Sequence, residues 1–294
     1  MNAIELKKLT KYYGKARGII DVDLVVNKGD FFGFIGPNGA GKSTSIRTIL
    51  GLISPSSGSA TVLGHDIIAE KKEILSKVGY LPAEAIFYHG MKVKDVLKLS
   101  ADLRGIDCAE EAKRLCERLQ LDMNRKVNEL SFGNRKKVAI VAALQHKPDI
   151  YILDEPTSGL DPIVRNEMLQ IFQEFVMDEN HTILLSSHIT GDLERIADMV
   201  VFIDHGKIVL SGNKDEILET HGLIKCKKEE VECIDKEDII SVRKSGFGAE
   251  VLVADKEKCS KKYEKMVMEN IALEDIMIFY VNREMEKSHG RTDL

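Results

Sequence analysis

A nine-residue loop, Gly36–Thr44, restricts the possible folds of this 294-residue chain more than any other feature. It reads GPNGAGKST and matches the spacing GxxxxGK(S/T). An apolar run, residues 30–36, comes directly before it, and a segment with helical spacing, residues 42–51, comes directly after it. Strand, glycine-rich loop and helix in this order predict a phosphate-binding loop in an α/β domain with a largely parallel sheet.

The residue types in this loop suit the binding of a nucleotide. Glycines allow backbone N–H groups to turn toward a phosphate, because a side chain would block the approach. Those N–H groups and the N-terminus of the following helix stabilise negative charge. We expect Lys42 to contact the β- and γ-phosphates, Ser43 to offer its hydroxyl to Mg²⁺, and Thr44 to lie near the α-phosphate. The predicted ATP-binding residues of the loop are Gly36, Asn38, Gly39, Ala40, Gly41, Lys42, Ser43 and Thr44.

Two carboxylates follow a second apolar run, in the segment Ile150–Pro156 (IYILDEP). The carboxyl ends of parallel strands share one edge of a sheet, and ligands of α/β folds bind at that edge. We expect Asp154 to orient Mg²⁺ and Glu155 to act as the general base that polarises an attacking water. An acidic pair at a strand end is a weak signal alone, and it becomes a strong one beside the phosphate-binding loop.

Composition excludes several other classes of protein. Lys and Arg number 42 against 47 Asp and Glu, a net charge of −5, whereas a non-specific nucleic-acid binder normally carries a basic excess. The five cysteines form no CxxC pair, which favours reduced thiols in a reducing cytosol. The N-terminal residues lack the apolar stretch of a signal peptide, and no run approaches the ~18 apolar residues that span a bilayer. We therefore expect a soluble, cytosolic chain that binds no nucleic acid and works at a membrane only through another subunit.

The pattern of apolar residues changes along the chain. Strand patterns broken by turns dominate residues 1–85, helical spacing dominates about 86–149, and strands alternate with helices over 150–210. Beyond about residue 215 the composition becomes charge-rich, with short apolar runs between the charged ones. We predict one domain over 1–215, with the helical segment inserted in it, and a small α+β region over 216–294.

Four motifs occur in the order found in the ATP-binding cassette (ABC) transporter ATPases, and the chain resembles that family through them. The motifs are Gly36–Thr44, the loop Leu130–Asn134 (LSFGN), the segment Asp154–Asp161 (DEPTSGLD) and the triplet Ser186–His188. The resemblance covers about residues 1–215. It implies a P-loop NTPase fold with a RecA-like ABC core, a β subdomain and an inserted α-helical subdomain, to which the last 79 residues add the α+β extension.

The resemblance also implies roles for two residues outside the phosphate-binding loop. In the family an aromatic side chain stacks on adenine, and Tyr13, directly before Gly14, matches it. The family's switch histidine, which contacts the γ-phosphate, matches His188. The alternatives are a tyrosine of a half-buried strand and a histidine with a purely structural role.

The loop Leu130–Asn134 resembles the family's signature loop, which contacts the γ-phosphate held by an opposite cassette. Ser131 supplies a hydroxyl and Gly133 a bare amide at the start of a helix that we expect to begin near Arg135. Asp161 matches the residue that couples the two sites across the dimer. Two cassettes would then meet head to tail around two ATP molecules, as a homodimer or as a heterodimer with a second ABC ATPase.

Two departures from the family pattern bear on the site. Phe132 and Asn134 stand where the signature loop usually has Gly and Gln, while the residues that would touch phosphate are retained. Ala83 stands where the family commonly has a glutamine whose amide contacts Mg²⁺ and the attacking water. Glu84 or a water could replace that amide, and the sequence leaves both open.

Two further features of the resemblance concern transport. The helical segment corresponds to the family's helical subdomain, whose groove near Ala83 receives a short helix of the membrane subunit. The tail Ala272–Ile278 (ALEDIMI) resembles the ending of the bacterial ABC-2-type exporter ATPases. We therefore expect the Mg²⁺-dependent, ATP-hydrolysing subunit of an exporter, peripheral on the inner face of the cell membrane through an integral permease. The alternatives are an importer ATPase and a soluble ABC ATPase that acts on DNA or the ribosome.

Overall fold

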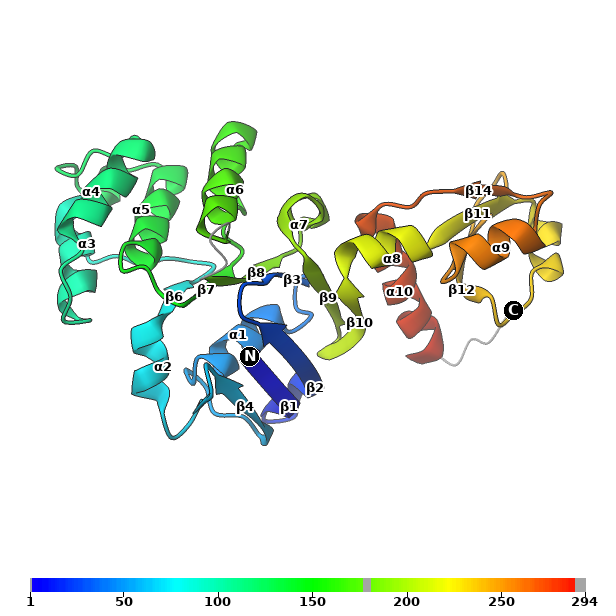
Figure 1. The fold of residues 1–294 in the computed structure, drawn as a ribbon, viewed down its shortest axis with the longest axis horizontal. Helices are drawn as coiled ribbons and strands as arrows, with labels where there is room; N and C mark the ends of the chain where they lie inside the picture. The colour runs from blue at the N-terminus through cyan, green and yellow to red at the C-terminus, as the bar shows by residue number, and fades with distance from the viewer. Residues whose placement is uncertain (1, 177–180, 289–294) are drawn as a thin grey trace.

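The structure, a computed structural model, describes residues 2–176 and 181–288. Three β-sheets with their associated helices make up this part of the chain (Figure 1). No helix in the described ranges is both long enough and apolar enough to cross a bilayer. In chain order the elements are β1 (Asn2–Tyr13), β2 (Ala16–Asn27), β3 (Phe31–Ile35), α1 (Lys42–Ile49), β4 (Ser57–Val62), β5 (His65–Asp66), α2 (Lys71–Lys77), β6 (Val78–Leu81), α3 (Val93–Asp102), α4 (Ala109–Arg118), η1 (Val127–Glu129), α5 (Phe132–Leu144), β7 (Ile150–Asp154), α6 (Pro162–Val176), β8 (Thr182–Ser187), α7 (Thr190–Ile196), β9 (Met199–Asp204), β10 (Lys207–Asn213), α8 (Lys214–Thr220), β11 (Gly222–Cys226), η2 (Lys228–Cys233), β12 (Ile239–Lys244), β13 (Ala249–Val253), α9 (Lys256–Lys262), β14 (Val267–Glu269) and α10 (Leu273–Ser288).

The central sheet has six strands in the order β10-β9-β3-β8-β7-β6. Its neighbouring strands from β9 to β6 run parallel, and β10 pairs antiparallel with β9 at one edge. The apolar runs that end at Ile35 and Asp154 are interior strands, buried along their whole length. Helices cover both faces of such a sheet, which explains why these runs are continuously apolar instead of alternating. The predicted α/β class with a largely parallel sheet is confirmed.

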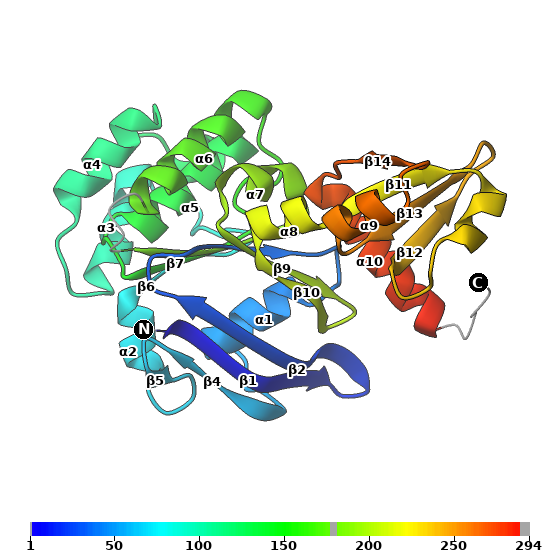
Figure 2. The same ribbon diagram turned by 45° about the vertical axis from the view of Figure 1, so that its right-hand side comes forward.

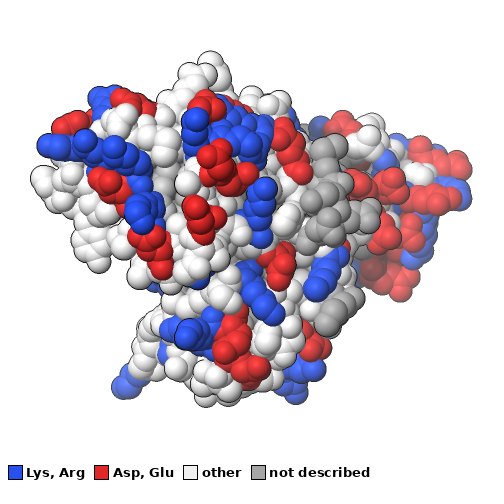
Figure 3. Space-filling model, turned by 60° about the vertical axis from the view of Figure 1, so that its left-hand side comes forward, with Lys and Arg blue, Asp and Glu red and all other residues white. Residues whose placement is uncertain are grey.

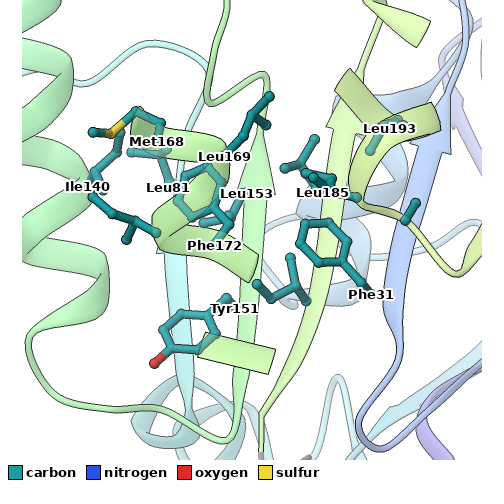
Figure 4. Close-up of a cluster of buried hydrophobic side chains, with 14 of the residues drawn as sticks. Phe31, Leu81, Ile140, Tyr151, Leu153, Met168, Leu169, Phe172, Leu185 and Leu193 are labelled. Atoms are coloured by element: carbon teal, nitrogen blue, oxygen red, sulfur yellow. The ribbon is translucent and has the colours of Figure 1, made fainter. Parts of the chain in front are cut away.

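One face of the central sheet packs against α5, α6 and α7. Tyr151 and Leu153 of β7 point to this face, where Phe172 of α6 and Ile140 of α5 lie over the strands (Figure 4). The residue between them, Ile152, belongs to the buried cluster on the opposite face, as the alternation of side chains along a strand requires. Burial of each large apolar side chain stabilises the fold by about 1.5–3 kcal/mol. This core therefore fixes the strand end that carries the acidic pair.

The opposite face of the central sheet packs against α1. A second sheet, antiparallel and in the order β2-β1-β4-β5, covers the far side of α1 (Figure 2). Ile46 and Ile49 of α1 share one buried cluster with Phe34 of β3 and Leu6 of β1. The helix that follows the glycine-rich loop is thus held between two sheets, and the loop itself lies at the carboxyl end of β3.

Helices α3, α4 and α5 form the segment that the sequence predicts as a helical insertion, on the far side of the molecule from the C-terminal elements (Figures 1 and 2). α5 begins at Phe132, so the predicted start near Arg135 is wrong. The reason is a side-chain cap, because Ser131 Oγ accepts a hydrogen bond from the Asn134 N–H at 3.3 Å.

The elements after β10 form a third sheet, in the order β12-β13-β11-β14, with α8, α9 and α10 beside it. Leu273, Ile276 and Phe279 of α10 belong to the same buried cluster as Leu193 of α7. The Leu273 N–H also donates to Glu194 Oε2 at 3.3 Å. A continuous core joins this C-terminal unit to the central sheet, and the exact boundary between the two regions stays a prediction of the sequence.

Candidate nucleotide-binding site

The phosphate-binding loop connects β3 to α1, as its spacing predicts. Gly36 lies so close to Ile203 that a Cβ would stand 2.3 Å from the Ile203 carbonyl oxygen, so no side chain fits there. Gly41 directly precedes α1 with φ 117°, a backbone conformation that favours glycine. Ser43 and Thr44 follow, half-buried, in the first turn of the helix. The loop thus lies at a helix N-terminus, where N–H groups and the helix dipole favour a bound phosphate.

Lys42 connects this loop to the acidic strand end. Its Nζ donates to the carbonyl oxygens of Gly36 at 2.6 Å and Pro37 at 3.2 Å. The same Nζ lies 3.2 Å from Glu155 Oε1, and both side chains are largely withdrawn from solvent. The structure therefore brings together the predicted phosphate-binding lysine and the predicted general base.

Glu155 lies between Lys42 and His188. Its Oε2 is 2.8 Å from His188 Nδ1 and accepts a longer hydrogen bond, 3.4 Å, from the His188 backbone N–H. The Glu155 backbone has φ 51°, an uncommon value for a residue other than glycine, and its N–H donates to the Ser186 carbonyl at 3.1 Å. Backbone strain of this kind concentrates at functional sites, where the surrounding structure has to maintain it. Ser186 of β8 holds the Glu155 backbone, while His188 and, from the phosphate-binding loop, Lys42 hold its carboxylate.

Asp154, the last residue of β7, is completely buried. Its Oδ1 accepts a hydrogen bond from Ser186 Oγ at 2.6 Å, and its Oδ2 has no hydrogen-bond partner among the residues that the structure describes. Such an oxygen is suited to accept a hydrogen bond from metal-bound water. Residues 2–176 and 181–288 contain no group of three His, Cys, Asp or Glu side chains that could hold a metal ion. Asp154 and Ser43 therefore fit a Mg²⁺ that takes its remaining ligands from phosphate and water, as this ion commonly does.

Tyr13 ends β1, and 47% of its surface is exposed. The Lys11 ammonium lies 5.5 Å from the centroid of its ring, within the range of a cation–π contact. A Cβ on Gly18 would stand 3.1 Å from Tyr13 Cε2 and 2.9 Å from Thr44 Cγ2. The tyrosine ring therefore lies beside the phosphate-binding loop and is half-exposed, and its stacking on adenine stays a prediction.

The signature-loop residues Ser131 and Gly133 lie at the N-terminus of α5. In the described part of the chain neither of them makes a hydrogen bond to the phosphate-binding loop. The signature loop packs instead against the segment before α6, where a Cβ on Gly159 would stand 2.7 Å from Phe132 Cε1. Asp161 caps α6, because its Oδ1 accepts from two N–H groups of the first helical turn, both at 3.1 Å. The contacts of these residues with a second cassette stay a prediction.

Position 83 contributes a backbone atom to the site. The Ala83 carbonyl accepts a hydrogen bond from Lys136 Nζ at 3.0 Å, and the same ammonium donates to the Glu155 carbonyl at 2.7 Å. Glu84 is exposed and lines a groove of about 380 Å³ with Phe132 and Lys136. The replacement of the missing amide by Glu84 or by a water stays a prediction.

Three residues that contact the site are absent from the sequence-based predictions: Gly18, Lys136 and Ser186. The sequence carries a signal for Ser186, because it stands in a motif quoted for the resemblance and pairs with Asp154 in the parallel register of β7 and β8. Lys136 is the first buried residue of α5, and a buried charged side chain needs a partner. Gly18 has no such signal, since its role depends on side chains that come close only in the folded chain.

Comparison with known proteins identifies the family to which this chain belongs. The family model for ABC transporters matches residues 19–158. The bacitracin transport ATP-binding protein BcrA of Bacillus licheniformis is 37% identical over 208 residues, which cover 70% of this chain and 68% of that protein. The Nod factor export ATP-binding protein I of Cupriavidus pinatubonensis is 33% identical over 222 residues, which cover 74% of this chain and 68% of that protein. A solved ATP-binding subunit of an ABC transporter matches with a TM-score of 0.68 and 31% identity, over 74% of this chain and 92% of that chain.

These matches confirm the predicted ABC-type P-loop fold. Members of this family bind and hydrolyse ATP, which is the chemistry that the phosphate-binding loop and the acidic strand end predict. The chain belongs to the ABC transporter family, as one of its ATP-binding subunits.

Proposed function

We propose that this chain hydrolyses Mg·ATP and thereby drives export through a separate integral membrane permease. The observation that carries the proposal is the convergence of Lys42, Glu155 and His188 at the carboxyl edge of the central sheet, beside the buried Asp154. Relatives named for bacitracin transport and Nod factor export favour the export direction.

The ion pair between Lys42 and Glu155 has a consequence for catalysis. The γ-phosphate of ATP would compete with Glu155 Oε1, 3.2 Å away, for the Lys42 ammonium. Once the ammonium turns to the phosphate, the carboxylate is free to accept a proton from an attacking water. His188, 2.8 Å from Glu155 Oε2, would then lie beside the same phosphate. Mg²⁺ held by Ser43 and Asp154 would neutralise charge on the phosphate oxygens.

Two cassettes are needed for the complete site. Ser131 and Gly133 offer a hydroxyl and an amide at the N-terminus of a 13-residue helix, an arrangement that binds anions. Neither residue is hydrogen-bonded to the described phosphate-binding loop of its own chain. This supports a head-to-tail dimer in which the signature loop of one cassette meets the ATP of the other. The partner is a second copy of the chain or another ABC ATPase.

The groove beside Ala83 is a suitable docking site for a helix of the permease. Residues 83–89, which we name the groove loop, line one part of it. Phe132 and Lys136 are among the other lining residues. Ile86 and Tyr88 of the groove loop expose 93% and 75% of their surfaces. Exposed apolar side chains that line a groove are typical of protein–protein interfaces, and an amphipathic helix could bury them. A chain docked there would lie peripherally on the inner face of the membrane.

The distribution of charge disfavours a soluble ABC ATPase that acts on nucleic acid. The net charge is −5, and basic and acidic side chains are interspersed over the face shown in Figure 3. A protein that follows a nucleic-acid backbone usually presents a continuous basic surface. An importer ATPase would share the chemistry of this site, so the identity of the permease distinguishes it from an exporter.

Affinity purification of the tagged chain from detergent-solubilised membranes of its host tests the proposed partner. Mass spectrometry should find a stoichiometric polytopic membrane protein with the wild-type chain. The same protein should be lost with an Ile86→Ser, Tyr88→Ser double variant that binds ATP as the wild type does. Recovery of ribosomal or DNA-bound proteins in place of a membrane protein would contradict the transporter assignment.

A further inference from the structure

We propose that Lys136 is a positioning residue that ties the groove loop to Glu155, and so transmits the position of the loop to the catalytic carboxylate. Lys136 lies on α5, and only 4% of its surface is exposed. Its ammonium donates to the Ala83 carbonyl at 3.0 Å and to the Glu155 carbonyl at 2.7 Å. One side chain thus joins three segments: α5, the groove loop, and the end of β7 with its acidic pair.

The burial of this ammonium makes both contacts important. Burial lowers the pKa of Lys136, and the nearby charges of Glu155, Asp154 and Glu84 act in the opposite direction. A buried charge without hydrogen-bond partners is strongly unfavourable, so the folded state favours conformations that keep both carbonyl oxygens in reach of the ammonium. The groove loop and Glu155 are therefore constrained to move together or to break a costly contact.

The backbone of Glu155 explains why such a contact would affect turnover. Its φ of 51° is a strained value, and the Lys136 ammonium holds the carbonyl of that same residue. A small shift of this peptide would rotate the side chain that has to meet the attacking water. Position 83 carries alanine, whose side chain has no polar atom, so this position can contact the site only through its backbone, and its carbonyl is the group that Lys136 holds.

Lys137 provides a matched control for this proposal. It follows Lys136 on α5, is buried to a similar degree with 8% of its surface exposed, and also has its ammonium hydrogen-bonded. It donates to the Leu119 carbonyl at 3.0 Å and lies 3.6 Å from Glu167 Oε2, and both partners are distinct from the acidic pair. Lys136→Met and Lys137→Met therefore remove the same chemical group from the same helix, and only the first removes the link to Glu155.

Steady-state ATPase kinetics of the full chain form the first test, and this arm rests on the proposed role of Glu155. Lys136→Met should lower kcat about tenfold or more, since loss of one positioning hydrogen bond commonly changes a rate by such a factor. The KM for ATP should stay within about twofold, because Lys136 contacts none of the phosphate-binding residues. Lys136→Gln keeps an N–H donor and should recover part of kcat, whereas Lys137→Met should leave kcat near the wild-type value. Equal kcat values for the two Met variants would overturn the proposal.

Hydrogen–deuterium exchange forms a second test that needs no ATP turnover. Lys136→Met should raise exchange in two peptides together, the one that spans residues 82–89 and the one that spans residues 154–160. Lys137→Met should raise exchange near residue 119 and leave both of those peptides unchanged. If Lys136→Met leaves either peptide at the wild-type rate, the link does not exist. If the exchange result holds while the wild-type chain hydrolyses no ATP, the link stands and the proposed function fails.

Discussion

At the scale of single residues, the site depends on a few charges held close together at the end of a buried sheet. Lys42 is the clearest example, with two carbonyl oxygens and one carboxylate around its ammonium. Charges interact more strongly in such a place than at an exposed surface, because the effective dielectric constant is lower. A phosphate that enters the loop would therefore gain much of its binding free energy from this one side chain.

Lys42→Ala should weaken ATP binding about 10- to 100-fold, because it removes a charge-assisted contact to the β- and γ-phosphates. Titration with a fluorescent ATP analogue measures this loss directly. Lys7→Ala, at an exposed lysine of β1, is the matched control and should bind as the wild type does. An unchanged affinity of Lys42→Ala would rule out the assignment of the phosphate-binding loop.

At the scale of helices and strands, the predictions hold where the local pattern decides the structure. β3 lies within the apolar run of residues 30–36, and the glycine-rich loop has the predicted strand before it and helix after it. The start of α5 could not be predicted from apolar spacing, because the side chain of Ser131 determines it. Asp154 ends the buried strand β7 and Glu155 follows it, as predicted, because the end of this strand is visible in the sequence.

The contacts between elements could not be predicted in the same way. The link from Lys136 to the Ala83 and Glu155 carbonyls joins α5 to two loops that are distant in sequence. The place of Gly18 against Thr44 depends likewise on how the second sheet lies on α1. These contacts follow from tertiary packing, which a single sequence does not reveal through periodicity or spacing.

The end of α5 gives stability a predicted pH dependence. His146 follows α5, and its Nε2 lies 3.3 Å from the Val78 carbonyl oxygen. Burial, and then the Arg104 charge, lower the pKa of His146 from 6.5 to about 4. Unfolding therefore takes up a proton between these two values, and the free energy of unfolding should fall as the pH drops from 6.5 to about 4.

Urea denaturation at several pH values measures this dependence. His146→Gln keeps a polar side chain near Val78 but cannot ionise, so it should flatten the profile below pH 6.5. His89→Gln, at an exposed position, should retain the wild-type slope. A wild-type slope in His146→Gln would show that this histidine does not contribute to acid sensitivity.

At the scale of the whole molecule, one core runs from the central sheet into the C-terminal unit. Ile276 and Phe279 of α10 share a buried cluster with Leu193 of α7, which follows the strand that leads to His188. Residues beyond β10 therefore support the cassette as well as themselves. We expect a single cooperative unfolding transition for the entire chain.

Phe279→Ala should lower the free energy of unfolding by about 3–5 kcal/mol, because it leaves a cavity in this shared core. Thermal unfolding followed by circular dichroism should show the cassette and the C-terminal unit unfolding together at a lower temperature. Phe247→Ala, at a fully exposed phenylalanine of the same unit, should change the stability by no more than about 0.5 kcal/mol. Two separate transitions in Phe279→Ala would show that the C-terminal unit does not stabilise the cassette.

We predict that Glu155 is the general base of an ATPase that works as a dimer closed around ATP. The most direct measurement combines ATP turnover with light scattering on Glu155→Gln, which keeps the size of the side chain and removes its basic oxygen. We predict turnover at least about 100-fold below the wild-type rate, together with a dimer that forms on addition of ATP. Glu117→Gln, at an exposed position of α4, should hydrolyse ATP as the wild type does. Wild-type turnover by Glu155→Gln would show that Glu155 is not the general base.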